Sequence, residues 1–159
     1  MKKKEDYNGR TMTDGWALGD KRDTLRALKI GCGWMKNDKL EPGSQMRRVG
    51  ERGVEDWSRE LKGVGITDMQ FGFHVFMTNK EDEETVVSLC KGLLVKFEAA
   101  GLKVPSIGVE LPKEALADMN AFLMDGGHRH EGLDREKLEA EKAKEDVSMY
   151  EWVPVHIYK

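Results

Sequence analysis

The sequence predicts an α+β fold, in which a single domain has one mixed β-sheet and helices packed chiefly on one face of it. A length of 159 residues suits one domain with a real core. The segment 69–78 (MQFGFHVFMT) is rich in aromatic and β-favouring residues. Apolar residues recur at helical spacing between Val86 and Phe97. Strands are expected near 25–35, 69–78, 104–111 and 150–158.

The chain begins with a polar stretch. Residues 1–24 contain several glycines and few apolar residues, so we expect an N-terminal arm preceding a single domain at 25–159. Trp16 is one residue that would attach this arm to the domain. The segment 25–35 (LRALKIGCGWM) alternates in the manner of a strand.

A short helix and a turn are expected next. Val54 to Leu61 suits a helix, because Trp57 and Leu61 lie one turn apart on its apolar side. Gly63 and Gly65 then indicate a tight turn into the strand at 69–78.

The following helix has the strongest sequence signature in the chain. Thr78 and Glu81 have the spacing of a capping box, and four acidic residues occupy the first turns, where the helix dipole favours them. Gly101 is expected to end this helix, because glycine commonly follows the last helical residue. The predicted apolar stripe consists of Val86, Leu89, Cys90, Leu93, Leu94 and Phe97.

A third strand at 104–111 would complete a strand–helix–strand unit, which is typical of a right-handed crossover. A second helix is expected to begin at Pro112 and to end at Gly126 and Gly127. Its predicted buried side consists of Leu116, Met119 and Leu123.

The last part of the chain is strongly charged. Residues 131–146 hold seven acids and four bases with few apolar residues, which predicts a solvated helix or a disordered linker. The segment 150–158 suits a strand, and Pro154 within it indicates a sheet edge or a bulge, because proline has no backbone N–H.

Composition limits the function classes. Net charge is −3, with +4 in residues 1–62 (15 basic, 11 acidic) and −7 in residues 63–159 (11 basic, 18 acidic). No stretch approaches the about 20 apolar residues of a membrane span, and no secretory signal is visible. We interpret the two cysteines, Cys32 and Cys90, as small apolar residues of a protein in a reducing compartment. We therefore expect a cytoplasmic protein without a cofactor.

The first candidate site is a glycine pair. Gly50 and Gly53 in "VGERGV" resemble the Gly-x-x-Gly loop with which K-homology modules clamp a nucleic-acid backbone. Arg47, Arg48 and Arg52 would pair with phosphates. Glu51 departs from this pattern, because a negative charge inside the loop opposes phosphate binding.

The second glycine pair, in "LKGVGITDM", resembles the hairpin of helix-hairpin-helix modules. The aromatic alternation that follows predicts a strand rather than a second helix, so a tight turn explains Gly63 and Gly65 with fewer assumptions.

Two histidine pairs offer other chemistry. His128 and His130 in "DGGHRHEG" would be metal ligands in a glycine-bounded loop, although no further ligands follow at a recognised spacing. His74 and His156 lie on predicted strands, in the manner of the two-histidine phosphoesterases. That family requires an aliphatic hydroxyl two residues after each histidine, whereas this chain has Phe76 and Tyr158 there.

The four tryptophans indicate either core packing or binding surfaces. Our first hypothesis is a non-enzymatic binding or assembly protein that acts through its surface, either on a protein partner or by self-association as an oligomer. The alternatives are a nucleic-acid-binding protein that uses the 50–53 loop and its arginines, and a small enzyme for phosphorylated or nucleotide substrates. The tryptophans are Trp16, Trp34, Trp57 and Trp152.

Overall fold

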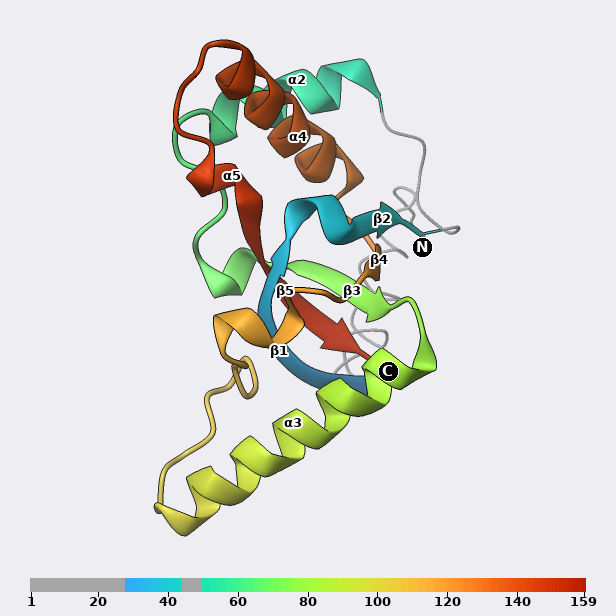
Figure 1. Cartoon of the computed structure of the whole chain (residues 1–159), viewed down its shortest axis with the longest axis vertical. Helices are drawn as coiled ribbons and strands as arrows, with labels where there is room; N and C mark the ends of the chain where they lie inside the picture. Colours follow the sequence, from blue (N-terminus) through green and yellow to red (C-terminus); the bar gives the residue numbers. More distant parts are fainter. Residues whose placement is uncertain (1–27, 44–49) are drawn as a thin grey trace, which may run out of the picture.

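The computed structural model describes residues 28–43 and 50–159, and it confirms the predicted α+β class (Figure 1). Over these residues the strands are β1 (Lys29–Lys36), β2 (Leu40–Pro42), β3 (Phe73–Met77), β4 (Ala121–Leu123) and β5 (Trp152–Tyr158). The α-helices are α2 (Glu51–Leu61), α3 (Lys80–Ala99), α4 (Gly127–Lys142) and α5 (Ser148–Glu151). The 3₁₀ turns are η1 (Asn37–Lys39), η2 (Met69–Phe71) and η3 (Lys113–Leu116). The arm expected at 1–24, with Trp16, lies outside the described residues.

The sheet is mixed, with strand order β1-β5-β3-β4-β2. β5 pairs antiparallel with β1 and parallel with β3, while β4 pairs antiparallel with β3 and parallel with β2. The last strand of the chain is therefore an interior strand.

One face of this sheet carries the core. Apart from Pro42, which is exposed at the end of the edge strand β2, the residues that share it through the strand register are fully or almost fully buried: Gly31, Gly33, Met35, Leu40, Phe73, Val75, Met77, Ala121, Leu123, Val153, Val155 and Ile157. The opposite face includes more exposed side chains, such as the cross-strand pair of Phe76 and Phe122.

The helical elements meet that same core face, as predicted. A Cβ at Gly31 would lie 2.6 Å from the Cys90 Sγ of α3, and one at Gly33 would lie 3.0 Å from Leu116 of η3. These glycines let the two elements approach β1 closely. In α4, the ring of His130 packs edge-on against Phe73, with 6.0 Å between the ring centroids.

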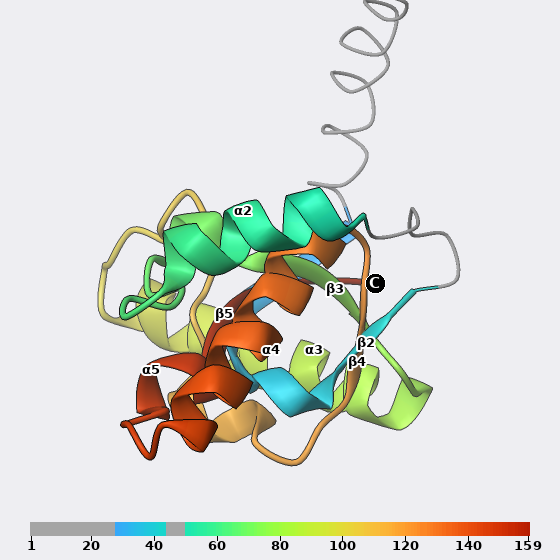
Figure 2. The ribbon, with the colours of Figure 1, turned by 90° about the horizontal axis from the view of Figure 1, so that it is seen from above.

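The helices lie at two ends of the molecule. α2 and α4 lie side by side at one end, and α3 extends away at the other (Figures 1 and 2). α3 begins one residue later than predicted, because the side chain of Asn79, not Thr78, accepts the backbone N–H of Asp82 at 2.7 Å.

The segment 104–111 is not a strand. It contributes one isolated bridge, in which Cys32 N–H donates to Val109 O at 2.9 Å and Leu111 N–H donates to Cys32 O at 2.8 Å. This bridge is parallel to β1, and β1 runs antiparallel to β3. The expected crossover between parallel strands is therefore absent from the described residues.

The segment after Pro112 also differs from its prediction. It forms the short turn η3 and then β4, not a helix that continues to Gly126. Leu116 and Leu123 are nevertheless buried, as predicted, but Leu116 lies in the 3₁₀ turn η3 and Leu123 lies in the strand β4. Similarly, Met69–Phe71 forms η2, so β3 begins only at Phe73.

The predictions for the C-terminal part were also incomplete. Most of 131–146 is helical, as one alternative predicted, but α4 is not solvated all round: Leu133, Glu136 and Ala140 are buried. Pro154 lies in an interior strand rather than at an edge. Its carbonyl group lies beside Gly72, before the first residue of β3. The missing N–H of Pro154 therefore breaks no hydrogen bond between β5 and β3.

Candidate binding pocket

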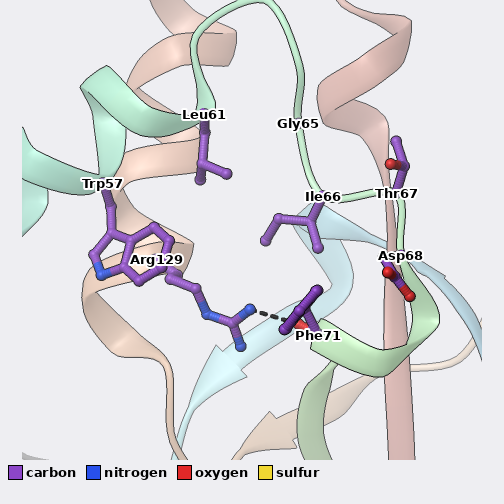
Figure 3. A pocket seen from close by; sticks show the side chains of 8 residues that line it. All are labelled: Trp57, Leu61, Gly65, Ile66, Thr67, Asp68, Phe71 and Arg129. Atoms are coloured by element: carbon purple, nitrogen blue, oxygen red, sulfur yellow. Dashed lines mark hydrogen bonds between the residues drawn. The ribbon is translucent and has the colours of Figure 1, made fainter.

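A small apolar pocket lies between α2, the start of α4 and the segment that leads into β3 (Figure 3). Its volume is about 260 Å³. The lining residues are Trp57, Leu61, Gly65, Ile66, Thr67, Asp68, Phe71 and Arg129.

The pocket has a buried base and an exposed aromatic rim. Leu61 and Ile66 are 7% and 6% exposed, whereas Trp57 and Phe71 are 38% and 60% exposed. Large aromatic side chains at the surface favour contact with another molecule, since their burial releases much apolar area from water.

Arg129 crosses the pocket between these aromatic residues. One of its N–H groups donates to Phe71 O, and its guanidinium carbon lies 4.5 Å from the ring centroid of Phe73 and 5.8 Å from that of Trp57. Burial lowers the pKa of Arg129 from its ordinary value, and the nearby Asp125 carboxylate opposes this change. Among the described residues, no carboxylate lies within ion-pair distance of its guanidinium.

Two glycines set how closely α2 and α4 pack beside the pocket. A Cβ at Gly132 would lie 2.8 Å from Ser58 N and 2.9 Å from Trp57 Cβ. A Cβ at Gly53 would lie 2.3 Å from the His128 ring. The close helix contact therefore holds the backbone of Trp57 against α4, and the Trp57 side chain forms one wall of the pocket.

The structure corrects the loop expected at 50–53. Gly50 is the N-cap residue of α2, and Glu51 to Gly53 form its first turn, so the glycine pair begins a helix rather than forming a separate loop. Nucleic-acid binding by this segment stays a prediction. Arg52 is exposed there, while Arg47 and Arg48 lie outside the described residues.

The histidines of the expected metal loop are in a helix instead. His128 and His130 lie in the first turn of α4 and point to different partners. The Nε2 of His128 accepts the N–H of Gly50 at 3.1 Å, and the Nε2 of His130 lies 3.2 Å from Asn37 O. Within 28–43 and 50–159, no group of three His, Cys, Asp or Glu residues is arranged to hold a metal ion.

His74 and His156 do come together. They are register neighbours on β3 and β5, and their rings stack with centroids 5.2 Å apart. The Nε2 of His156 lies 2.7 Å from Met69 O, which can only accept, so this nitrogen donates its proton. The Nδ1 of His156 then accepts from the Lys29 ammonium at 2.7 Å.

His156 is therefore held as a neutral ring with both nitrogens engaged. Burial lowers its pKa below the ordinary 6.5, and the Lys29 ammonium lowers it further. Burial likewise lowers the pKa of His74, whose Nδ1 lies 2.7 Å from the hydroxyl group of Tyr158. This arrangement suits structural hydrogen bonding, because His156 has no nitrogen left for a substrate.

The second glycine pair forms the predicted turn. Gly63 and Gly65 have φ values of +73° and +71°, which favour glycine. Gly63 N–H donates to the Tyr150 hydroxyl at 2.7 Å, so it is not free to bind a phosphate. A hollow of about 570 Å³ beside this turn has four carboxylates in its lining, namely Glu136, Glu139, Glu145 and Asp146.

The other described tryptophans lie away from the pocket. Trp34 and Trp152, on β1 and β5, are half-buried with the ammonium of Lys113 5.8 Å and 5.1 Å from their ring centroids. Sequence reasoning identified Trp57 as a candidate anchor but missed Ile66, Phe71 and Arg129. No spacing in the sequence links Phe71 to Arg129, since only the packing of α4 brings them together.

Comparisons of the chain with protein-family models, with curated proteins and with solved structures found no match. Of the helices in the described part of the chain, none combines the length and apolarity that crossing a bilayer requires.

Proposed function

We propose that this protein is a non-enzymatic binding protein that takes an apolar side chain of a protein partner into the pocket at Trp57, Phe71 and Arg129. The observation that carries this proposal is the combination of two exposed aromatic rings with a half-buried arginine around one apolar hollow. Tryptophan and arginine are the residues most enriched at the energetic centres of protein interfaces.

The size of the pocket supports a side chain as its occupant. Its 260 Å³ falls below the about 300 Å³ at which pockets for drug-sized ligands begin. One aromatic or large aliphatic side chain would fill it.

The charge of Arg129 suggests what lies next to that side chain. Arg129 meets no carboxylate at ion-pair distance among the described residues, and it lies beside apolar surface that a partner would cover further. A partner carboxylate would form the direct ion pair that the nearby Asp125 does not form, because arginine binds carboxylates with two parallel hydrogen bonds. The expected partner segment therefore has an Asp or Glu near its apolar anchor.

The surrounding charge favours a protein over a nucleic acid. α2 and α4 together carry nine acidic and six basic residues, a net charge of −3. Asp68 also lies in the pocket lining. A phosphate backbone has a negative charge at every nucleotide and would approach this surface against repulsion, whereas a peptide needs only one carboxylate, placed at Arg129.

The test is selection from a random peptide library displayed against the full chain. We expect the selected peptides to share an aromatic or large aliphatic residue with a neighbouring Asp or Glu. Trp57→Ala and Arg129→Gln should each weaken their binding at least about tenfold, as loss of an interface anchor does. Phe122→Ala, which changes an exposed aromatic residue on β4, is the matched control and should leave affinity unchanged.

Two results would contradict the proposal. Peptides that bind equally well to the Trp57 and Arg129 variants would show that the pocket is not the site. Tight binding of single-stranded oligonucleotides with a steep salt dependence would favour the nucleic-acid alternative.

A further inference from the structure

Arg129 and the apolar hollow beside it set the requirements for an occupant of the pocket. Arg129 has no carboxylate at ion-pair distance among the described residues, and the hollow is lined mainly by apolar side chains. A fitting segment therefore has a large apolar anchor with an acidic residue near it. The chain itself contains such a segment, because Asp14 and Trp16 lie two residues apart in TDGWALGD, residues 13–20. Residues 1–27 lie outside the part of the chain that the structure describes.

Trp16 suits the hollow better than Tyr7, which is the other aromatic residue of 1–27. The Arg129 side chain crosses the hollow beside Trp57 (Figure 3), and its guanidinium carbon lies 5.8 Å from that ring centroid. Among aromatic side chains, tryptophan attracts a cation most strongly. A Trp16 ring in the hollow would therefore gain from the cation as well as from the burial of its apolar area.

Asp14 would meet the same cation. In an extended segment, residues two apart project to the same side and are separated by about 7 Å along the chain. A Trp16 ring in the hollow would therefore bring the Asp14 carboxylate near the Arg129 guanidinium. A carboxylate and a guanidinium form two parallel hydrogen bonds, and such charged pairs are stronger than neutral hydrogen bonds.

The chain between Trp16 and the sheet is long enough for this contact. It joins the sheet at Leu28, beside the Tyr158 end of β5. Pro154, four residues earlier on β5, lies beside the residue that follows Phe71 of the pocket rim. Four strand residues cover about 13 Å, whereas the connection from Trp16 to Leu28 can extend over about 40 Å.

Charge also favours this pairing. Residues 1–27 carry seven basic and five acidic side chains, a net charge of +2. α2 and α4, which lie on two sides of the pocket, together carry a net charge of −3. This attraction would draw the segment toward the pocket end of the molecule, and added salt would weaken it.

We propose that the Trp16 segment occupies the pocket of its own chain and so regulates the access of the protein partner. This rests on the proposed function, because both use the same site. A short tether gives such a segment an effective concentration of about 1 mM. If the free segment binds with a Kd of about 0.1 mM, tethering leaves the pocket about nine-tenths occupied and weakens partner binding about tenfold.

The experiment uses a fluorescent peptide with the sequence of residues 10–22, whose binding to full-length chains is followed by anisotropy. We expect the peptide to bind the Trp16→Ala chain with a Kd of about 0.1 mM or lower. Wild type should bind it at least about tenfold more weakly, because its own segment occupies the pocket. Tyr7→Ala is the matched control within residues 1–27 and should behave as wild type does.

Second substitutions in the Trp16→Ala chain locate the bound peptide. Trp57→Ala and Arg129→Gln should each weaken its binding at least about tenfold, whereas Phe122→Ala, on the opposite face of the sheet, should leave it unchanged. Asp14→Asn in the peptide should weaken binding to the Trp16→Ala chain but have no further effect when Arg129→Gln is present. Melting temperatures of all variants check that the fold is retained.

Three results would overturn the proposal: equal affinity of wild type and Trp16→Ala for the peptide, no binding to Trp16→Ala below about 1 mM, or binding that survives the Trp57 and Arg129 substitutions. Wild-type oligomers that dissociate in Trp16→Ala would place the segment in the pocket of a second copy, which contradicts the intramolecular arrangement.

Failure of this proposal can be told apart from failure of the proposed function. Library-selected peptides that need Trp57 and Arg129, yet bind wild type and Trp16→Ala equally, would support the function and remove the Trp16 segment as the occupant. If no peptide binds at Trp57 and Arg129 in either chain, both proposals are wrong.

Discussion

Arg129 joins the packing of the core to the candidate pocket. Its guanidinium lies 4.5 Å from the Phe73 ring centroid on the core side and donates to Phe71 O at the rim. The cation is thus held at a fixed place by the same aromatic residues that exclude water from it. This fixed position reduces the entropy that binding would otherwise cost.

His156 shows a different use of a polar side chain. It is 4% exposed and bridges two distant parts of the chain, because its nitrogens meet Lys29 of β1 and the carbonyl group of Met69. Only the contact with Lys29 needs a neutral ring, because Nδ1 must accept there, whereas the donation from Nε2 to Met69 O is made in either protonation state. Protonation would remove the acceptor and place a second positive charge beside the Lys29 ammonium.

The stability of the fold should therefore depend on His156 at mildly acidic pH. The folded-state pKa lies below the ordinary 6.5, so protons bind the unfolded chain more readily. The contribution of neutral His156 is complete above about pH 6.5 and is lost as pH falls toward the folded-state pKa. The slope for one histidine is at most about 1.4 kcal/mol per pH unit.

His156→Gln tests this dependence, because glutamine can donate to Met69 O and accept from Lys29 but does not titrate. Urea unfolding between about pH 7 and about pH 5 should show a smaller loss of unfolding free energy in the variant than in the wild type. His74 titrates in both proteins, but its ring stacks on His156 and is one of the groups that lower the pKa of His156, so the difference reports His156 together with its effect on His74. Parallel curves would refute the prediction.

At the scale of elements, α2 and α4 pack closely because glycines stand at their contact. The close contact at Gly132 brings Ser58 within hydrogen-bond reach of the buried Glu136, and Arg135 forms an ion pair with Glu51 at 2.7 Å. One face of α4 can be buried despite the charged sequence of the helix, because the side chains on that face are small, apolar or hydrogen-bonded to a partner.

Gly132→Ala and Gly92→Ala are the same substitution inside two helices with opposite surroundings. A methyl group at Gly132 meets the backbone of α2, so we expect the free energy of unfolding to fall by about 1–3 kcal/mol. At Gly92 it meets open space, so we expect a gain of about 0.5–1 kcal/mol. Urea unfolding at low protein concentration measures both, and equal effects would show that the helix contact is looser than described.

At the scale of the whole molecule, packing is uneven. β5 is paired on both sides, and all its residues from Val153 to Tyr158 are buried. The last turns of α3, by contrast, have no fully buried residue. Stability against local opening should therefore differ strongly between these two elements.

Hydrogen exchange followed by mass spectrometry measures that difference. At low protein concentration, we expect amides of β5 to exchange only through global unfolding and those of residues 94–99 to exchange at least about tenfold faster. Similar protection in both elements would contradict the uneven packing.

The sequence by itself determined the elements whose signals are local. The alternation in 25–35 and 150–158 indicated β1 and β5, and the stripe from Val86 to Phe97 indicated α3. Gly63 and Gly65 indicated a turn, since glycine adopts a left-handed backbone without the steric cost that other residues have. These signals depend on a residue and its near neighbours, so one chain is enough to reveal them.

Only the tertiary structure decided which of these elements meet. The short strands β2 and β4 exist because neighbouring strands offer them partners, and Pro154 is tolerated inside the sheet because β3 starts beyond it. The pocket was equally hidden, because Phe71 and Arg129 are distant in sequence and meet only when α4 packs beside α2. Pairing and burial are properties of contacts between distant segments, and the local pattern of a sequence does not contain them.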